Sequence, residues 1–222
     1  MLKRKIIFGD YDTAVNGWTL TGWKLSAATQ KTNYVEKSGG DGSWDLSTAM
    51  TDGIPKYKDR TLTVTLECSE GDRLSREEKI RLMVNQLDGM REDIILPDDD
   101  SHYINGRIHV TRDYNDMAHA AVTVTATCKP WKYSNAEKRR DLIASTSAQA
   151  TTLINLGRRA VVPLITISGE GASVALTYGT LTKTMSAGSY QWPDLLLTPG
   201  SHVLQYKGTG SVSITYREAV LE

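Results

Sequence analysis

Residues 61–68 read TLTVTLEC and form the clearest strand pattern of the chain. Four apolar side chains alternate with polar ones along this stretch: Leu62, Val64, Leu66 and Cys68. A period of two places them on one face of a β-strand and the threonines on the other. Residues 121–128, AVTVTATC, repeat the valine and threonine alternation, so the two segments can pair, with Cys68 and Cys128 at matching ends of their patterns. One face of such a sheet belongs to a core, and the other is solvated or forms a polar interface.

The period of the apolar residues changes after this strand. Four of them recur at helical spacing: Ile80, Met83, Val84 and Leu87. Ser75 stands three residues before Glu78, which is the form of a capping box, and Gly89 is placed to end a helix. We therefore predict one amphipathic helix near residues 75–89 that covers a face of the sheet.

Other segments of the first half also predict strands. In residues 18–25, Thr21, Trp23 and Leu25 share a face, and packing in a core or interface is the expected role of the tryptophans. In residues 107–112, Ile108 and Val110 point inward and His109 outward. Pro130 should end this half, because proline cannot continue a central strand. Residues 134–150 include a short basic run at 138–140 and predict a solvated connector.

The second half is β in pattern throughout. The predicted strands are residues 151–155, 161–168, 173–178, 181–186, 189–192, 202–207 and 211–217, with turns at 168–171, 187–188, 198–201 and 208–210. Seven short strands separated by Gly and Pro turns are typical of a β-sandwich. Two sets of residues should form its inner faces: Val174, Leu176 and Tyr178, and Val212, Ile214 and Tyr216. We expect a mainly β chain, with an N-terminal β-sandwich domain carrying the helix at residues 1–133 and a second β-sandwich at 134–222.

Composition limits the function classes. The 222 residues suffice for two domains of about 100 residues each, with no need of disulfides. Lys and Arg number 26, and so do Asp and Glu, which argues against a general nucleic-acid or membrane-surface binder. Cys68 and Cys128 lack metal-ligand spacing and are expected to be buried. Because only three apolar residues follow the basic N-terminus, we expect a soluble protein made in a cytoplasm, without a membrane partner.

The residue patterns of catalysis are missing. None of the four histidines stands in a metal-binding motif, and the nucleophile and phosphate-binding motifs based on glycine are absent. Asp98, Asp99 and Asp100 form an acidic turn without the ligand spacing of a calcium loop. Asp41 and Asp45 flank Ser43, but Asp and Ser are also the residues that turns use. We predict no enzyme, cofactor or metal site.

The segment between residues 33 and 60 predicts an ordered, shaped loop. Gly39, Gly40 and Gly42 allow backbone conformations with positive φ, and the neighbouring Asp and Ser side chains can bond their own backbone. Tyr34 and Val35 open the segment in extended form.

This segment belongs to a series of motifs that resembles a known family. The motifs read FGDYDT at 8–13, NYVE at 33–36, DGSWDLS at 41–47, YKDR at 57–60 and CKPWKY at 128–133. NLG at 155–157, PLITI at 163–167, LTPG at 197–200 and ITYRE at 214–218 continue them. Their order and spacing resemble the distal tail proteins (Dit) of phages with long, non-contractile tails and of related prophages, over most of the chain. The residues carried over to this family's loop, in a structural role, are Gly39, Asp41, Gly42, Ser43, Asp45, Leu46, Tyr57 and Arg60.

The resemblance implies a structural protein of the virion tail tip. Six copies would form a ring from their N-terminal domains, and the C-terminal domains, galectin-like sandwiches in this family, would project outward. The implied partners are other copies of the chain, the tail-tube protein, and a tail-associated adhesin or lysin protein. DNA would pass through the lumen of the ring without specific binding.

Two other classes of function remain open from the residues. A β-sandwich module that binds carbohydrate on a host surface would use Tyr190 and Trp192 to stack on a sugar ring. A hydrolase of envelope polymers would need a carboxylate or metal site, which the sequence does not reveal.

Overall fold

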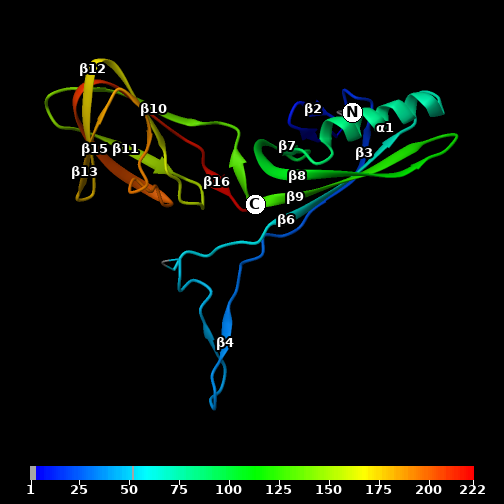
Figure 1. Ribbon diagram of the computed structural model, residues 1–222, viewed down its shortest axis with the longest axis horizontal. Coiled ribbons are helices and arrows are strands. Elements are labelled where there is room, and N and C mark those ends of the chain that lie inside the picture. Colours follow the sequence, from blue (N-terminus) through cyan, green and yellow to red (C-terminus); the bar gives the residue numbers. More distant parts are fainter. Residues whose placement is uncertain (1–3, 52) are drawn as a thin grey trace. The chain divides into compact units, whose positions relative to one another are not determined.

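The computed structural model describes residues 4–51 and 53–222 (Figure 1). Over these residues the chain is mainly β-structure with one α-helix, so the predicted mainly β class with a single helix is confirmed. The chain divides into two compact units, Met1–Lys132 and Tyr133–Glu222, and strand β9 runs across the division. No helix in this described part is long and apolar enough to cross a membrane.

Unit 1 is built on one sheet. Its strands lie in the order β2 (Tyr11–Asp12), β1 (Ile7–Phe8), β7 (Arg91–Leu96), β8 (Asp99–Asn115), β9 (Ala120–Ser134), β6 (Arg60–Cys68) and β3 (Thr19–Leu25). The predicted pairing of the two valine and threonine segments is confirmed, because β6 and β9 are antiparallel neighbours. Antiparallel pairing places the cysteines at opposite ends of this ladder, with Cys68 opposite Ala120 and Cys128 opposite Arg60. Both cysteines are buried, as expected.

The alternation along β6 and β9 gives the sheet two different faces. The inner face contributes buried aliphatic side chains to the core of unit 1: Leu62, Val64, Leu66, Val122, Val124 and Ala126. The outer face carries three directly opposed threonine pairs: Thr61–Thr127, Thr63–Thr125 and Thr65–Thr123. Opposed threonines are favourable cross-strand pairs on a solvated face, so one period-two pattern produces both a core and a polar surface.

Helix α1 (Arg73–Leu87) covers the inner face next to β8 and buries Ile80, Met83 and Leu87, as predicted. The predicted capping box is wrong, because the N-cap is Asp72, whose side chain accepts a hydrogen bond from the Ser75 backbone N–H. Aspartate is as good an N-cap as serine, and with Asp72 in that place the helix starts one turn earlier.

Arg76 is buried on the same side of the helix. It donates hydrogen bonds to the carbonyl oxygens of Gly71, Asp116 and Met117. The guanidinium therefore fixes the turn between β8 and β9 to the start of the helix.

Strand β3 differs from the prediction at Thr21. The register with β6 shifts between Leu20 and Gly22, so Thr21 lies in a bulge and is exposed. Leu20, Trp23 and Leu25 pack against the core instead. One extra residue in a strand moves the side chains before it to the other face. A strict alternation takes no account of this bulge, and it therefore placed Thr21 on the same face as Trp23 and Leu25.

Strand β9 continues through Pro130, so the predicted stop is wrong. The ladder with β6 ends where Cys128 lies opposite Arg60, two residues earlier. Pro130 therefore lies beyond the end of the ladder with β6, and its missing N–H costs no hydrogen bond to that strand.

Unit 2 is a β-sandwich made by two long bent strands and four short ones. Their bounds are β10 (Lys138–Ala144), β11 (Gln149–Asn155), β12 (Leu164–Tyr178), β13 (Leu181–Ser186), β14 (Gly188–Gln191) and β15 (Gly200–Tyr216); β16 (Ala219–Val220) follows. The first half of β12 and the second half of β15 pair with each other and with β14 and β10. Their other halves pair with each other and with β13 and β11, which gives the second layer. The two predicted inner faces meet in one core.

The bends replace turns that the sequence predicted. Residues 168–171 and 208–210 lie inside β12 and β15, where the β12–β15 register shifts between Ser168 and Ser173. Gly208 and Gly210 have positive φ, and a Cβ on Gly208 would lie 2.1 Å from the Ser173 carbonyl oxygen. Glycine is needed here because two backbones touch where both strands change layer.

Part of the predicted connector is also a strand. Residues 138–144 form β10, which pairs with β15 from Lys138 opposite Tyr216 to Ala144 opposite Gly210. Leu142 packs against the core and Ala144 is buried in it, whereas the three basic residues are exposed. Charged side chains on an edge strand discourage pairing with a further strand. The basic run is therefore compatible with a strand, although in sequence it resembles a solvated connector.

Candidate functional site

The segment at residues 33–47 forms a β-hairpin, which we call the arm. Strand β4 (Tyr34–Glu36) pairs with β5 (Ser43–Asp45) in a small sheet of its own (Figure 1). Residues 43–45, predicted as loop, are thus a strand. Gly39 and Gly42 both have φ of +74° and close the connection between the strands, which is the use that the sequence predicted for glycine here.

Side chains at the open end of the arm fix its two strands. Asp45 accepts a hydrogen bond from the Ser47 backbone N–H (2.9 Å), and Ser47 Oγ accepts one from the Asn33 N–H (2.9 Å). The Leu46 N–H donates to the Asn33 carbonyl oxygen (2.8 Å). Hydrogen bonds from the Ser47 side chain and backbone lower the pKa of Asp45. Asp45 and Ser47 therefore act in the local structure, whereas Asp41 lies exposed at the tip.

Tyr57 and Arg60 anchor the chain where it returns to the sheet. The Tyr57 ring meets Trp131 of β9 edge-on, with ring centroids 5.4 Å apart, and Tyr57 also forms an isolated β-bridge with Gln30. Arg60 is buried, and its Nε donates to the Ser26 carbonyl oxygen (2.7 Å). The eight residues of the loop motif thus divide into a projecting hairpin and a base, in which Arg60 is buried and Tyr57 partly buried; the sequence could not separate the two parts.

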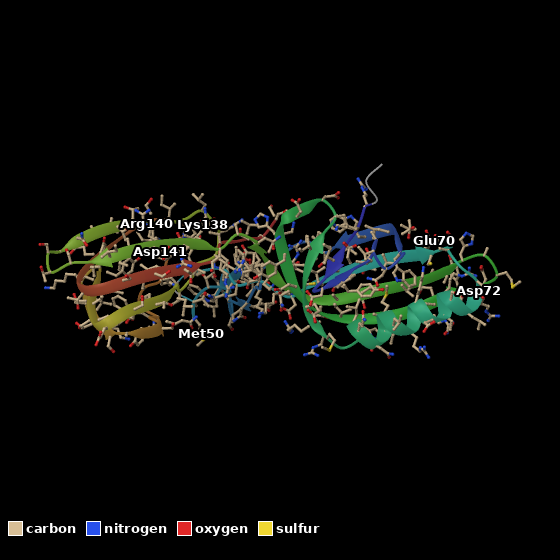
Figure 2. The ribbon with its side chains drawn as sticks, turned by 90° about the horizontal axis from the view of Figure 1, so that it is seen from above. Met50, Glu70, Asp72, Lys138, Arg140 and Asp141 are labelled. Atoms are coloured by element: carbon tan, nitrogen blue, oxygen red, sulfur yellow. The ribbon has the colours of Figure 1, made fainter. Side chains whose placement is uncertain are left out.

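One face of the arm is mainly apolar, with the Lys37 Nζ 5.0 Å from the centroid of the Trp44 ring, and the other face is mixed. Val35 lies opposite Trp44, and Leu46 follows two residues later on the same face. These side chains are 45%, 60% and 42% exposed. On the other face Tyr34 lies opposite Asp45, and Glu36 opposite Ser43. Beyond β5, Met50 is almost fully exposed (Figure 2). The arm therefore exposes several large apolar side chains outside the core of unit 1.

The two aromatic candidates for sugar binding lie in unit 2 but do not form a platform. Trp192 is 2% exposed, and its indole N–H donates to Asp194 (2.9 Å). Tyr190 is partly buried against the core, and its hydroxyl lies 3.3 Å from Ser186 Oγ. Stacking on a sugar needs an open ring face, which Trp192 does not offer in this structure.

A serine, a histidine and an aspartate do meet in unit 1, at the start of β8. Ser101 Oγ and Asp99 Oδ1 lie 2.9 and 3.0 Å from the same ring nitrogen, Nδ1 of His102. A catalytic triad needs the serine on one ring nitrogen and the carboxylate on the other. This arrangement cannot pass a proton in that way.

The same cluster has an evident structural role. Lys132 Nζ lies 3.3 Å from the second Asp99 oxygen. Burial disfavours the Asp99 carboxylate, but hydrogen bonds from His102, Ser101 and Lys132 outweigh burial and lower its pKa to about 2. Across the described residues, no three His, Cys, Asp or Glu side chains gather as possible metal ligands.

The NLG motif at residues 155–157 has a structural explanation. Asn155 is buried, its Nδ2 donates to the carbonyl oxygens of Arg159 and Leu197 (2.8 Å each), and its Oδ1 accepts from the Gly157 N–H (3.0 Å). A Cβ on Gly157 would lie 2.7 Å from the Ala219 nitrogen. Both residues therefore shape a tight loop of unit 2.

Comparison with known proteins identifies the fold. No family model matches the chain, and no curated protein matches its sequence. Among solved structures, the chain is similar to the crystal structure of the SPP1 Dit protein, described as a paradigm of the hub adsorption apparatus in phages that infect Gram-positive bacteria. The TM-score is 0.69 at 15% sequence identity, over 96% of this chain and 98% of that one. The chain therefore has a Dit-like fold along nearly its whole length.

Proposed function

We propose that this protein is a hub subunit of a phage tail tip. In this proposal six copies close into a ring that joins the tail tube to the proteins that recognise the host. The likeness in fold to SPP1 Dit, over 96% of this chain and 98% of that one, supports this role. The proposed place of the protein is the virion, after synthesis in the bacterial host.

The exposed arm is the structural feature that best supports a ring. A two-stranded hairpin is marginally stable by itself in water, and this one exposes Val35, Trp44 and Leu46 on one face. A second copy can cover that face if the arm of each subunit contacts a different surface of the next. Contacts of this head-to-tail kind close into a ring when the rotation between subunits divides a full turn.

The other implied partners follow from the place of such a ring. The tail-tube protein would contact one side, and an adhesin or lysin protein the other. In this proposal DNA passes through the lumen without specific binding. The work of such a subunit is mechanical and requires no cofactor.

The test is the mass of the purified chain by light scattering across concentration, followed by negative-stain imaging. One chain has a mass of 24.5 kDa, and the proposal predicts a species of six times that mass with a central hole. A chain that stays monomeric at high concentration, and also when mixed with its tail-tube neighbour, would refute the ring.

A double variant tests the arm. Val35→Ser with Trp44→Ser should abolish the six-fold species and leave each unit folded, because both side chains lie outside the two cores. Val15→Ser is the matched control, since Val15 is a highly exposed valine of unit 1 outside the arm. Assembly of the double variant at wild-type concentrations would show that the arm is not the contact.

A further inference from the structure

Unit 1 contains a pocket that has no part in the arm. Its lining comes from the β1–β2 hairpin, the loop after it, β7 and the end of α1, which lie together in unit 1 (Figure 1). Its volume is about 450 Å³, which is within the range of pockets that bind small ligands. The FGDYDT motif at residues 8–13 supplies Phe8, Asp10 and Tyr11 to the lining. This motif therefore builds a pocket that the proposed ring does not explain.

The pocket combines an apolar inner wall with an acidic rim. Phe8, Tyr11 and Leu87 belong to the buried core of unit 1 and close the pocket on the inside. The remaining lining residues are polar: Asp10, Asn16, Gln86 and Glu92. The lining thus carries two carboxylates and no basic group. A cleft lined by one sign of charge concentrates ions of the opposite sign, so the expected ligand is a cation.

Both carboxylates are available to a ligand. Asp10 is exposed in the turn between β1 and β2, and Glu92 is half-buried on β7. The Glu92 carboxylate lies over Gly9, in the space that a Cβ on Gly9 would occupy. Within the part of the chain that the structure describes, neither carboxylate has a hydrogen bond or an ion pair. A ligand would therefore not have to displace an existing partner.

Three basic residues near the pocket are engaged elsewhere. Lys5 pairs with Asp12 at 2.6 Å, and Arg91 donates to a side chain on the neighbouring strand β8. Lys79 Nζ lies 3.5 Å from Cys68 Sγ and is not among the lining residues. The end of α1 adds to the negative potential, because the C-terminal end of a helix carries partial negative charge and the last turn of α1 has no basic residue.

We propose that this pocket binds the guanidinium group of an arginine from a partner protein. An organic cation fits better than a metal ion, because the apolar wall offers no ligands and the described residues contain no group of three His, Cys, Asp or Glu side chains that could hold a metal. Arginine fits better than lysine, because its planar guanidinium is more weakly hydrated and can bond a carboxylate through two parallel hydrogen bonds. Its aliphatic stem would pack on the inner wall. That a protein presents the arginine rests on the proposed function, in which the neighbours of a hub subunit are other tail proteins.

The first test compares two ligands of the same shape. N-acetyl-arginine amide carries a guanidinium, and N-acetyl-citrulline amide carries a neutral urea group in its place. Saturation-transfer NMR with the full chain and millimolar ligand should detect the arginine compound, and the citrulline compound should bind at least about tenfold more weakly, because hydrogen bonds between charged groups are the strong ones. Equal signals from the two compounds, or no signal from either, would overturn the proposal.

The second test removes one charge at a time. Glu92→Gln keeps the shape of the side chain and should weaken binding of the arginine compound about tenfold, and Asp10→Asn should act in the same direction. Asp98→Asn is the matched control, because Asp98 is an exposed acid of unit 1 in the turn between β7 and β8, outside the lining. Equal affinities of Glu92→Gln and Asp98→Asn would overturn the proposal. These variants leave the arm intact, and the NMR signal does not require assembly, so a failed pocket and a failed ring give different results.

Discussion

Replacing Gly208 with alanine tests the bent-strand architecture of unit 2. Gly208 lies within β15 with φ of +139°, opposite Val174 of β12. A Cβ there would lie 2.1 Å from the Ser173 carbonyl oxygen and 2.9 Å from the Val174 Cα. Both are backbone atoms of the paired strand, which cannot rotate away as a flexible side chain would. Gly208→Ala must therefore separate the strands or change the backbone at the bend.

Two separate costs contribute to the loss of stability. A residue with a side chain held in a conformation that only glycine adopts readily costs about 1–3 kcal/mol. Forcing an extra carbon into filled space costs about 1–3 kcal/mol more. We therefore expect a loss of about 2–6 kcal/mol, which is a large part of the roughly 5–15 kcal/mol that stabilises a typical domain.

Gly171→Ala is the control from the other bent strand. Gly171 has φ of +63°, and no atom lies within 4 Å of the position of its Cβ. Alanine there should carry the backbone cost alone, about 1–2 kcal/mol. The comparison isolates the close approach of the two strands at Gly208.

Thermal unfolding, with hydrogen exchange followed by mass spectrometry on peptides of β12 and β15, would measure both variants. For a unit of this size, 1 kcal/mol shifts Tm by about 4–8 °C. Gly208→Ala should therefore lower the Tm of unit 2 by about 10 °C or more, and Gly171→Ala by clearly less. Equal shifts for the two variants would refute the reasoning, because they would mean that the strands do not touch at Gly208.

Two further predictions concern unit 1. Asp72→Ala should lower the Tm of unit 1 more than Ser75→Ala, because the Asp72 carboxylate accepts from the Ser75 N–H and caps the helix; the opposite order would restore Ser75 as the N-cap. Asp99 has a pKa of about 2 in the folded chain against 3.8 ordinarily, so the unfolded chain binds more protons between these values. The stability that Asp99 contributes is complete above about pH 4 and is lost as pH falls toward about 2. Asp99→Asn should thus lower the unfolding midpoint at pH 6 and much less at pH 2, and a difference that is independent of pH would contradict the assignment.

Patterns of period and burial could be predicted from the sequence, because they depend on near neighbours in the chain. The alternation in residues 61–68 and 121–128 predicted a pair of strands, their core face and their polar face. The helical spacing around Met83 predicted which side of α1 is buried. In these segments the local preference and the tertiary contacts agree, which is usual for natural sequences.

Other features depend on partners that are distant in sequence. Glycine with positive φ serves a tight turn and a bent strand equally well, so Gly208 and Gly210 predicted a turn where the structure has a corner. Strand β10 is recognisable only through its pairing with β15, since its exposed charges hide the inward Leu142. Pro130 lies in a strand because its neighbour has already ended.

The exposed face of the arm could not be predicted from the sequence for the same reason. Three tryptophans illustrate it: Trp18 and Trp192 are buried, as the general habit of large aromatic side chains predicts, whereas Trp44 is exposed on the arm. The sequence around Trp44 predicts the glycine-rich connection but not the second strand. An exposed tryptophan can be identified only once the hairpin is seen to stand apart from the core.

In the proposed ring, closure would add to the small contact that each arm can make. Complete burial of a large aliphatic side chain contributes about 1.5–3 kcal/mol, and Val35 and Leu46 are already half covered, so one arm alone would make a weak contact. In the proposed ring each subunit gives one arm and receives another. An open chain of six copies has one such contact fewer than the closed ring, and its two free ends each keep an uncovered surface. Ring closure adds that last contact without the cost of bringing in another subunit. Weak single contacts would thus keep free subunits soluble, while six of them together would hold a ring.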